Sequence, residues 1–189
     1  MEVLRAVTLT VLIDGPSGSG KTTLAGDLAS RLGARVVHLD DFYPGWSGLA
    51  AASRQVADSV LAGHLPGYRR WDWENDRPGQ WVALDPGEDL IVEGVGALSA
   101  GSLRAAAARG AVVSVVIDAP ARLRQRRAFD RDAEDNYGEF WQMWARQEKE
   151  HFARWAREGV VPDLLIGSGS NPPKVWRLRR PNVLSHIRL

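Results

Sequence analysis

A glycine-rich stretch near the start of the chain ends in one lysine and two threonines. Residues 13–29 read IDGPSGSGKTTLAGDLA, in which Gly15, Gly20, Lys21 and Thr22 fill the pattern G-x-x-x-x-G-K-[ST]. Glycines allow positive φ angles and bring backbone N–H groups close to a phosphate, while the lysine places a positive charge on the β- and γ-phosphates. The threonine hydroxyl is a ligand for Mg²⁺. The pattern therefore predicts a loop that binds nucleotide phosphates, with further contacts from Ser17, Gly18, Ser19 and Thr23.

Acidic residues follow or end two apolar runs of the chain. Asp40 and Asp41 come at the end of residues 35–39, and Glu93 lies within residues 90–95. A hydroxyl that accepts a phosphoryl group needs a carboxylate that orients it and takes its proton, and either aspartate suits this role. An ordinary turn or helix cap explains the aspartates equally well. Glu93 suits a Mg²⁺ site, directly or through water, with a solvated strand end as the alternative.

Arginines crowd one later segment, residues 122–131, which read RLRQRRAFDR. Guanidinium groups stabilise the charge that spreads over the oxygens of a phosphoryl group in transfer. The alternative is a solvated helix in a chain that uses arginine heavily and has lysine only at positions 21, 149 and 174. The density of arginines favours a functional role without selecting one of them.

These residues need a scaffold that brings them together, and the apolar pattern supplies one. β-Branched residues before the glycine-rich loop predict a buried strand, and leucines at four-residue steps after it predict a helix that stops at Gly33. Predicted strands cover residues 7–13, 35–39, 90–95, 111–117 and 164–166; predicted helices cover residues 21–32, 49–62, 98–109, 121–131 and 134–157. This alternation predicts an α/β fold, a five-stranded parallel sheet with helices on both faces. Sites in such sheets form at the carboxyl ends of the strands.

The whole chain sets further limits. Its 189 residues predict a single domain spanning residues 1–189. The net charge of +1 gives no argument for nucleic acid or an anionic membrane as a partner, and neither is expected. The lack of cysteine excludes a disulfide or a thiolate nucleophile. No leader or membrane-length apolar run is visible, so a cytoplasmic location is expected. Residues 63–87 are rich in Pro, Gly, Trp and charge and predict a long functional loop or a small excursion from the main fold. The aromatic residues of 137–155 predict a core-facing helix stripe, with His151 on or beside it.

Taken together, the motifs resemble the P-loop kinases of the uridine kinase and nicotinamide riboside kinase type. The matching segments are GPSGSGKTT at 15–23, LDDFY at 39–43, VEGVGAL at 92–98, the arginine-rich 122–132 and PDLLIGSG at 162–169. They occur in the family's order and sample nearly the whole chain. The first motif is shared by many NTPases, and the Asp-Asp-Phe-Tyr element narrows the resemblance.

The resemblance implies a P-loop NTPase fold, ATP and Mg²⁺ as cofactors, and a small-molecule acceptor. Asp40 would be the base for the acceptor hydroxyl, and Thr22 would ligate Mg²⁺ with Glu93 behind it. Residues 121–135 would form a lid over the phosphates, with Arg126 and Arg127 as catalytic residues and Arg122 as a nucleotide contact. Strand alternation would point Asp40 toward the phosphate loop and Asp41 the other way.

The acceptor region departs from the family. The family's His-Pro-Asp stretch is replaced by YRRWDWENDRPGQW at 68–81, in which Asp72 would take the place of the aspartate that holds sugar hydroxyls. We expect acceptor contacts from Tyr43, Tyr68, Arg69, Asp72 and Trp73, besides Asp40. Such a pocket suits a flat or anionic hydroxylated molecule. A nucleoside or a nucleoside-like molecule is one acceptor of this kind. The alternative is that the tryptophans only pack a lid against the core.

Other functions of P-loop proteins compete with a kinase. A regulatory GTPase is disfavoured because the chain has no Asn-Lys-x-Asp motif. An ATPase normally needs a larger chain or extra domains. A non-catalytic nucleotide-binding module would not need Lys21, Thr22, Asp40 and Glu93 together. The sequence therefore predicts phosphoryl transfer to a small molecule, with an ATPase or a binding protein as the alternative.

Overall fold

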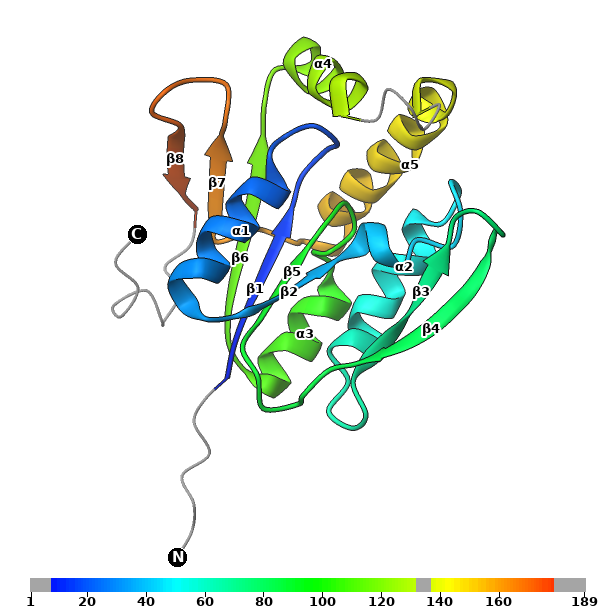
Figure 1. Cartoon of the computed structure of the whole chain (residues 1–189). Helices are drawn as coiled ribbons and strands as arrows, with labels where there is room; N and C mark the ends of the chain where they lie inside the picture. Colours follow the sequence, from blue (N-terminus) through cyan, green and yellow to red (C-terminus); the bar gives the residue numbers. More distant parts are fainter. Residues whose placement is uncertain (1–7, 132–136, 179–189) are drawn as a thin grey trace, which may run out of the picture.

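The computed structural model describes residues 8–131 and 137–178 and builds one central sheet flanked by helices (Figure 1). In sheet order, the strands are β2 (Arg35–His38), β5 (Leu90–Glu93), β1 (Thr8–Asp14), β6 (Gly110–Asp118), β7 (Leu164–Gly167) and β8 (Lys174–Arg177). The first five run parallel, and β8 pairs antiparallel with β7. The P-loop NTPase fold predicted from the sequence is confirmed, and the five predicted strands lie within two residues of the observed ones. The sheet differs from the prediction by its sixth strand, β8.

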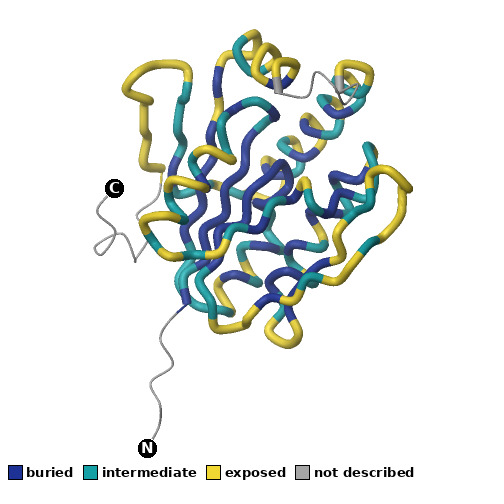
Figure 2. Tube along the Cα trace, in the orientation of Figure 1, coloured by how far each residue is buried: buried dark blue, intermediate teal, exposed yellow. Residues whose placement is uncertain are grey.

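Helices cover both faces of the sheet. On one face, α1 (Lys21–Leu32) packs Ala25, Leu24 and Leu28 against β1, β5 and β6. On the other, α2 (Leu49–Gln55), α3 (Ala100–Arg109) and α5 (Tyr137–Glu158) cover a larger core. Figure 2 shows the central strands as the most deeply buried part of the chain. Because both faces are covered, these strands read as continuous apolar runs, which made them predictable.

The segment at residues 63–87 contains a β-hairpin, so the excursion from the main fold that its composition predicted has regular structure. β3 (Gly67–Asp72) and β4 (Arg77–Ala83) form a separate two-stranded antiparallel sheet with an irregular register between Arg69 and Trp71. At its base, the Leu84 N–H donates to the Pro66 carbonyl at 2.9 Å. The hairpin stands beside α2 in Figure 1, so it extends the molecule at the β2 side of the sheet.

The remaining helices differ slightly from the predictions. The predicted helix 49–62 is α2 followed by a π-helical turn at Val56–Val60. The predicted helix 98–109 begins at Ala100, because Ser99 caps it by accepting the Ser102 N–H. The arginine-rich segment is α4 (Ala121–Arg131); residues 132–135 of the expected lid and the predicted start of the next helix at 134 lie outside the described residues. None of the described helices has the length and apolar character needed to cross a membrane.

Candidate active site

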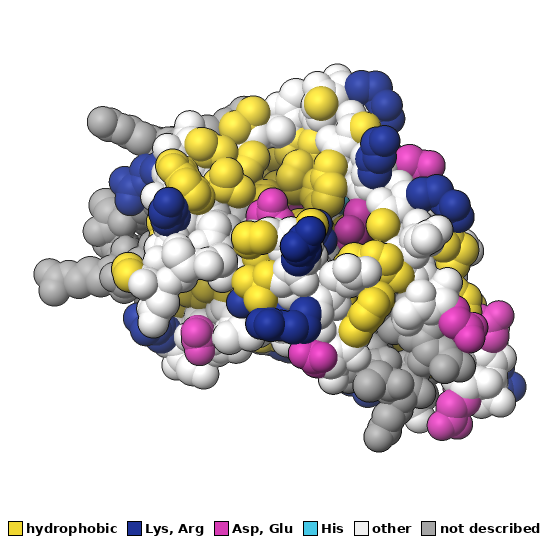
Figure 3. All heavy atoms as spheres, turned by 90° about the horizontal axis from the view of Figure 1, so that it is seen from above, with side chains coloured by type: hydrophobic (Ala, Val, Ile, Leu, Met, Phe, Trp, Pro, Cys, Tyr) yellow, Lys and Arg dark blue, Asp and Glu magenta, His cyan; other side chains and the backbone are white. Residues whose placement is uncertain are grey.

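A cleft of about 1500 Å³ opens at the carboxyl ends of the parallel strands. Figure 3 looks onto this edge of the molecule, where acidic side chains lie in a hollow framed by hydrophobic ones. The cleft brings together Lys21, Asp40 and Glu93, three residues from different parts of the sequence. The rest of the phosphate-binding motif from Ser17 to Thr23, together with Tyr43, Trp73 and Arg127, also lines it. Its position is the one expected for a site in an open parallel sheet.

The phosphate-binding loop connects β1 to α1 and depends on its glycines. Gly15, Gly18 and Gly20 have φ angles of +140°, +74° and +104°, a region that side-chain-bearing residues rarely adopt. A Cβ at Gly15 would collide with the Ile117 carbonyl, and one at Gly18 with the Arg124 carbonyl. Gly20 precedes the first turn of α1, whose free N–H groups and positive dipole end face the cleft. The backbone is therefore shaped to receive an anion.

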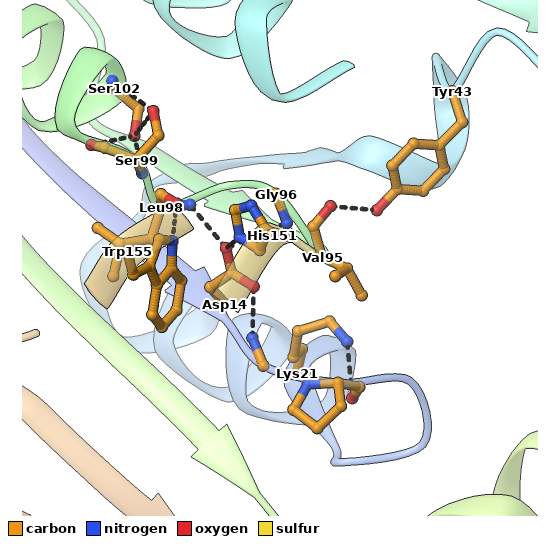
Figure 4. A network of polar contacts seen from close by, with 12 residues as sticks. Asp14, Lys21, Tyr43, Val95, Gly96, Leu98, Ser99, Ser102, His151 and Trp155 are labelled. Carbon is orange, nitrogen blue, oxygen red and sulfur yellow. Dashed lines mark hydrogen bonds and ion pairs between the residues drawn. The ribbon is translucent and has the colours of Figure 1, made fainter. Parts of the chain in front are cut away.

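The side chain of Lys21 is hydrogen-bonded to the backbone of the phosphate-binding loop. Its Nζ donates to the Pro16 carbonyl at 3.2 Å (Figure 4). Thr22 lies at the next position and donates its hydroxyl to Glu93 Oε1 at 3.0 Å. The predicted metal-binding pair, Thr22 and Glu93, is thus brought into direct contact at the end of β5.

The donor set of this pair fits Mg²⁺, which prefers oxygen ligands. Among the described residues, no group of three or more His, Asp or Glu side chains is arranged to hold a metal by itself. Mg²⁺ in phosphate sites is usually held by one or two protein oxygens, with phosphates and water completing its shell. The hydroxyl of Thr22 and the carboxylate of Glu93 match that arrangement and not a closed protein cage.

A histidine that sequence reasoning did not select also belongs to this group. His38, the last residue of β2, lies 2.6 Å through its Nδ1 from Glu93 Oε1. The hydrogen bond to Glu93, helped by the nearby Asp41 and Asp40 charges, raises the pKa of His38 above its ordinary 6.5. Burial opposes this shift. His38 is thus poised to carry charge close to Glu93.

Asp40 and Asp41 both line the cleft, but their surroundings differ. They lie in a single 3₁₀ turn, Leu39–Asp41, after β2 ends at His38. The strand alternation used to separate them therefore does not apply. Asp41 accepts the Tyr68 hydroxyl at 3.0 Å and lies 3.6 Å from Arg70, so the hairpin holds it. Asp40 is exposed to the cleft, and its carbonyl accepts the Trp73 indole N–H at 3.3 Å.

The other predicted acceptor contacts fall into two groups. Tyr43 and Trp73 line the cleft; Tyr43 is fully buried, donates to the Val95 carbonyl at 2.8 Å, and burial holds its pKa well above the ordinary value. Tyr68, Arg69 and Asp72 do not line it. Arg69 donates across the hairpin to the Gly79 carbonyl, and Asp72 holds the hairpin turn by accepting the backbone and side-chain N–H groups of Asn75. Those Asn75 hydrogen bonds lower the pKa of Asp72.

An aromatic wall bounds the acceptor end of the cleft. Trp46 lies 5.2 Å from Trp73, ring centre to ring centre, and stacks on Phe140 of α5 at 4.4 Å. Trp144, also from α5, packs edge-on against Tyr43 at 4.8 Å. The helix stripe predicted as core packing is core at Trp144 and Trp155, while Phe140 supports the cleft wall.

The arginines of α4 do not contribute equally. Arg127 lines the cleft and lies 3.4 Å through Nη1 from both the Gly18 carbonyl and the Ser168 hydroxyl. Arg124 donates to the Ser17 carbonyl at 3.2 Å. Arg122 and Arg126 are exposed and are not among the residues that line the cleft. Because the loop side of α4 carries Arg124 and Arg127, the pair Arg122 and Arg126 lies on a different face of the helix.

Behind the loop lies a network of polar contacts that the sequence did not predict. Asp14, fully buried, accepts the backbone N–H groups of Gly15, Gly96 and Leu98, and lies 3.0 Å from His151 Nε2 (Figure 4). Ser168 donates to the Ser19 carbonyl at 2.6 Å. No local motif marks these contacts, because each joins residues more than 80 positions apart except the Asp14–Gly15 turn.

Comparisons with known proteins give similar folds among solved structures. No family model matches the chain, and no curated protein matches it. One similar structure is described as a possible uridine kinase from Bacillus stearothermophilus, with 26% identity, 73% of this chain and 85% of that chain covered, and a TM-score of 0.45. Another is the APS kinase of Mycobacterium tuberculosis, with 18% identity, 87% and 90% covered, and a TM-score of 0.47. A sugar kinase from a Janibacter species has 16% identity, 65% and 66% covered, and a TM-score of 0.38. All three are described as kinases.

Proposed function

We propose that the protein transfers the γ-phosphoryl group of ATP, with Mg²⁺, to a hydroxyl of a small molecule. The observation that carries the proposal is the contact of Thr22 with Glu93 at the mouth of an intact phosphate-binding loop, in the same cleft as Asp40. A loop that only binds nucleotide needs neither carboxylate. Phosphoryl transfer needs both, one beside the metal and one beside the acceptor.

The residues divide the work by position. The loop N–H groups and Lys21 bind the β- and γ-phosphates, and Arg127 adds charge from the α4 side. Thr22 and Glu93 would hold Mg²⁺, which when bound would offset the negative charge of the phosphates. Asp40 orients the acceptor hydroxyl and takes its proton. Catalysis in this scheme combines positioning and charge with removal of the acceptor proton by Asp40.

We infer a flat, hydroxylated acceptor such as a nucleoside-like molecule. The neighbouring indoles of Trp46 and Trp73 suit a planar ring. Asp40, Asp41 and Glu74 line this end of the cleft, while the basic lining residues Lys21 and Arg127 belong to the phosphate end. This division of charge supports an acceptor without net negative charge, in preference to the anionic one that the arginines of residues 68–81 suggested.

An ATPase or a non-catalytic nucleotide-binding protein is the alternative. A binding protein would leave the aromatic wall and Asp40 without a role, and an ATPase would leave the aromatic wall without one. The two alternatives differ from a kinase in one measurable property, which is the dependence of ATP consumption on an acceptor.

The test is ATP turnover with Mg²⁺, alone and with single nucleosides, sugars and alcohol-bearing vitamins. We expect slow hydrolysis alone and strong stimulation by one neutral or cationic planar acceptor, with a phosphorylated product visible by mass spectrometry. Lys21→Ala should lower the stimulated rate by about 100-fold or more, the effect of losing one preorganised charge. Acceptor-independent hydrolysis would indicate an ATPase, and binding without turnover under every condition would indicate a binding protein.

A further inference from the structure

Helix α5 contacts the phosphate-binding loop through two buried polar side chains. Glu148 Oε1 accepts the Ser17 backbone N–H at 2.8 Å and the Ser17 hydroxyl at 2.7 Å. One turn further along, His151 pairs with Asp14, the residue at which β1 enters the loop. Both side chains are buried, at 6% and 3% exposure. The helix therefore holds the loop at its entrance and at its tip.

The bonds to Ser17 leave this residue few free polar groups. Its N–H and hydroxyl go to Glu148, and its carbonyl accepts from Arg124. Ser17 was expected to contact the nucleotide, yet its N–H already has a protein acceptor. A carboxylate beside an anion-binding loop also repels a phosphate, which is a cost unless it brings another benefit. A loop that is already ordered before the nucleotide binds would offset this cost.

We propose that Glu148 is a positioning residue that preorganises the tip of the phosphate-binding loop for ATP, an inference that rests on the proposed function. A glycine-rich loop has many accessible conformations, and ordering it during binding would weaken the affinity. The two bonds from Ser17 to one buried oxygen fix the tip before the nucleotide arrives. The neighbouring residue Gln147 donates to the Trp46 carbonyl at 2.8 Å, so one turn of α5 touches both ends of the cleft.

This role can be tested without an acceptor by measuring, with calorimetry, the affinity of the protein for a non-hydrolysable ATP analogue in the presence of Mg²⁺. Glu148→Ala should weaken the affinity about tenfold or more, since two buried donors lose their partner and the loop tip loses its anchor. Glu148→Gln retains an oxygen that accepts both bonds and should bind at least as tightly as the wild type. Glu150→Ala removes an exposed carboxylate of the same helix and should change nothing.

Each other result has a definite meaning. An unchanged affinity in Glu148→Ala with a lowered melting temperature would assign Glu148 a structural role only and overturn the proposal. A Glu148→Gln variant as weak as Glu148→Ala would also overturn it, because geometry would not be the cause. If Glu148→Ala does not fold, Ser17→Ala replaces it: loss of the hydroxyl bond alone should weaken binding, and an unchanged affinity overturns the proposal. A wild-type protein that binds no ATP analogue would overturn the proposed function itself.

Discussion

Asp40 and Asp41 differ in what surrounds them, and this difference gives the sharpest prediction at the scale of single residues. Asp40→Asn preserves size and removes the proton acceptor, so kcat should fall by about 100-fold or more while ATP affinity stays nearly constant. Asp41→Asn should be milder in kcat, because Asp41 is held by Tyr68 and Arg70. Turnover and nucleotide affinity of both variants are the measurements. An inactive Asp41→Asn beside a nearly normal Asp40→Asn would reverse the assignment.

Single residues also show how far the sequence predicts the site. The phosphate loop, Thr22 and Glu93 are close together as expected, because a contiguous motif and a strand end define them. Asp72 was expected in the acceptor site but holds the hairpin turn. The prediction for Asp72 came only from its position relative to the family's acceptor-binding aspartate. The neighbouring sequence does not distinguish a carboxylate that faces a turn from one that faces a cleft. Glu148 and His151 were missed because their partners lie more than 130 residues away along the chain.

At the scale of elements, helix α4 presents two neighbouring arginines to different surroundings. Arg127→Ala should lower kcat by about tenfold or more, since Arg127 lines the cleft beside the Gly18 carbonyl and can reach a transferring phosphoryl group. Arg126→Ala is the matched control, because Arg126 is exposed on the same helix, and it should leave kcat nearly unchanged. Steady-state kinetics and melting temperatures of both variants test this. Equal losses in the two variants would mean that the lid acts through its total charge.

Two of the strands that sequence analysis missed, β4 and β8, are largely exposed to solvent. β8 is exposed at all four of its residues, and most of β4 is exposed as well. A strand with water on both faces needs neither an apolar run nor a regular alternation, so its pattern carries no signal. The buried strands β1, β5 and β6 had strong signals for the opposite reason.

At the scale of the whole molecule, the His38–Glu93 pair links folding stability to pH. The pKa of His38 is raised in the folded state, so its contribution is fully present below the ordinary pKa of 6.5 and is lost as the pH rises through the raised value. We therefore expect the free energy of unfolding of the wild type, relative to His38→Asn, to decrease as the pH rises across this window. Urea unfolding of both proteins at a series of pH values is the measurement.

The partner residue provides the control for this prediction. In Glu93→Gln the first cause of the raised pKa is removed, although the Asp41 and Asp40 charges remain. The free energies of unfolding of Glu93→Gln and of the double variant Glu93→Gln/His38→Asn should therefore be compared. Their difference should depend less on pH than the difference between the wild type and His38→Asn. A dependence of the same size in both backgrounds would assign the titration to another group.

The hairpin base has a consequence for how this molecule can change over evolutionary time. The hairpin leaves and rejoins the domain at nearly one point, where Leu84 bonds to Pro66, and its strands form a sheet of their own. An insertion or an exchange within residues 67–83 alters no register of the central sheet and no bond of the phosphate loop. Under the proposed function, mutations in the hairpin can therefore change the acceptor specificity without changing the residues that transfer the phosphoryl group. Relatives can diverge in substrate while they retain the same catalytic residues.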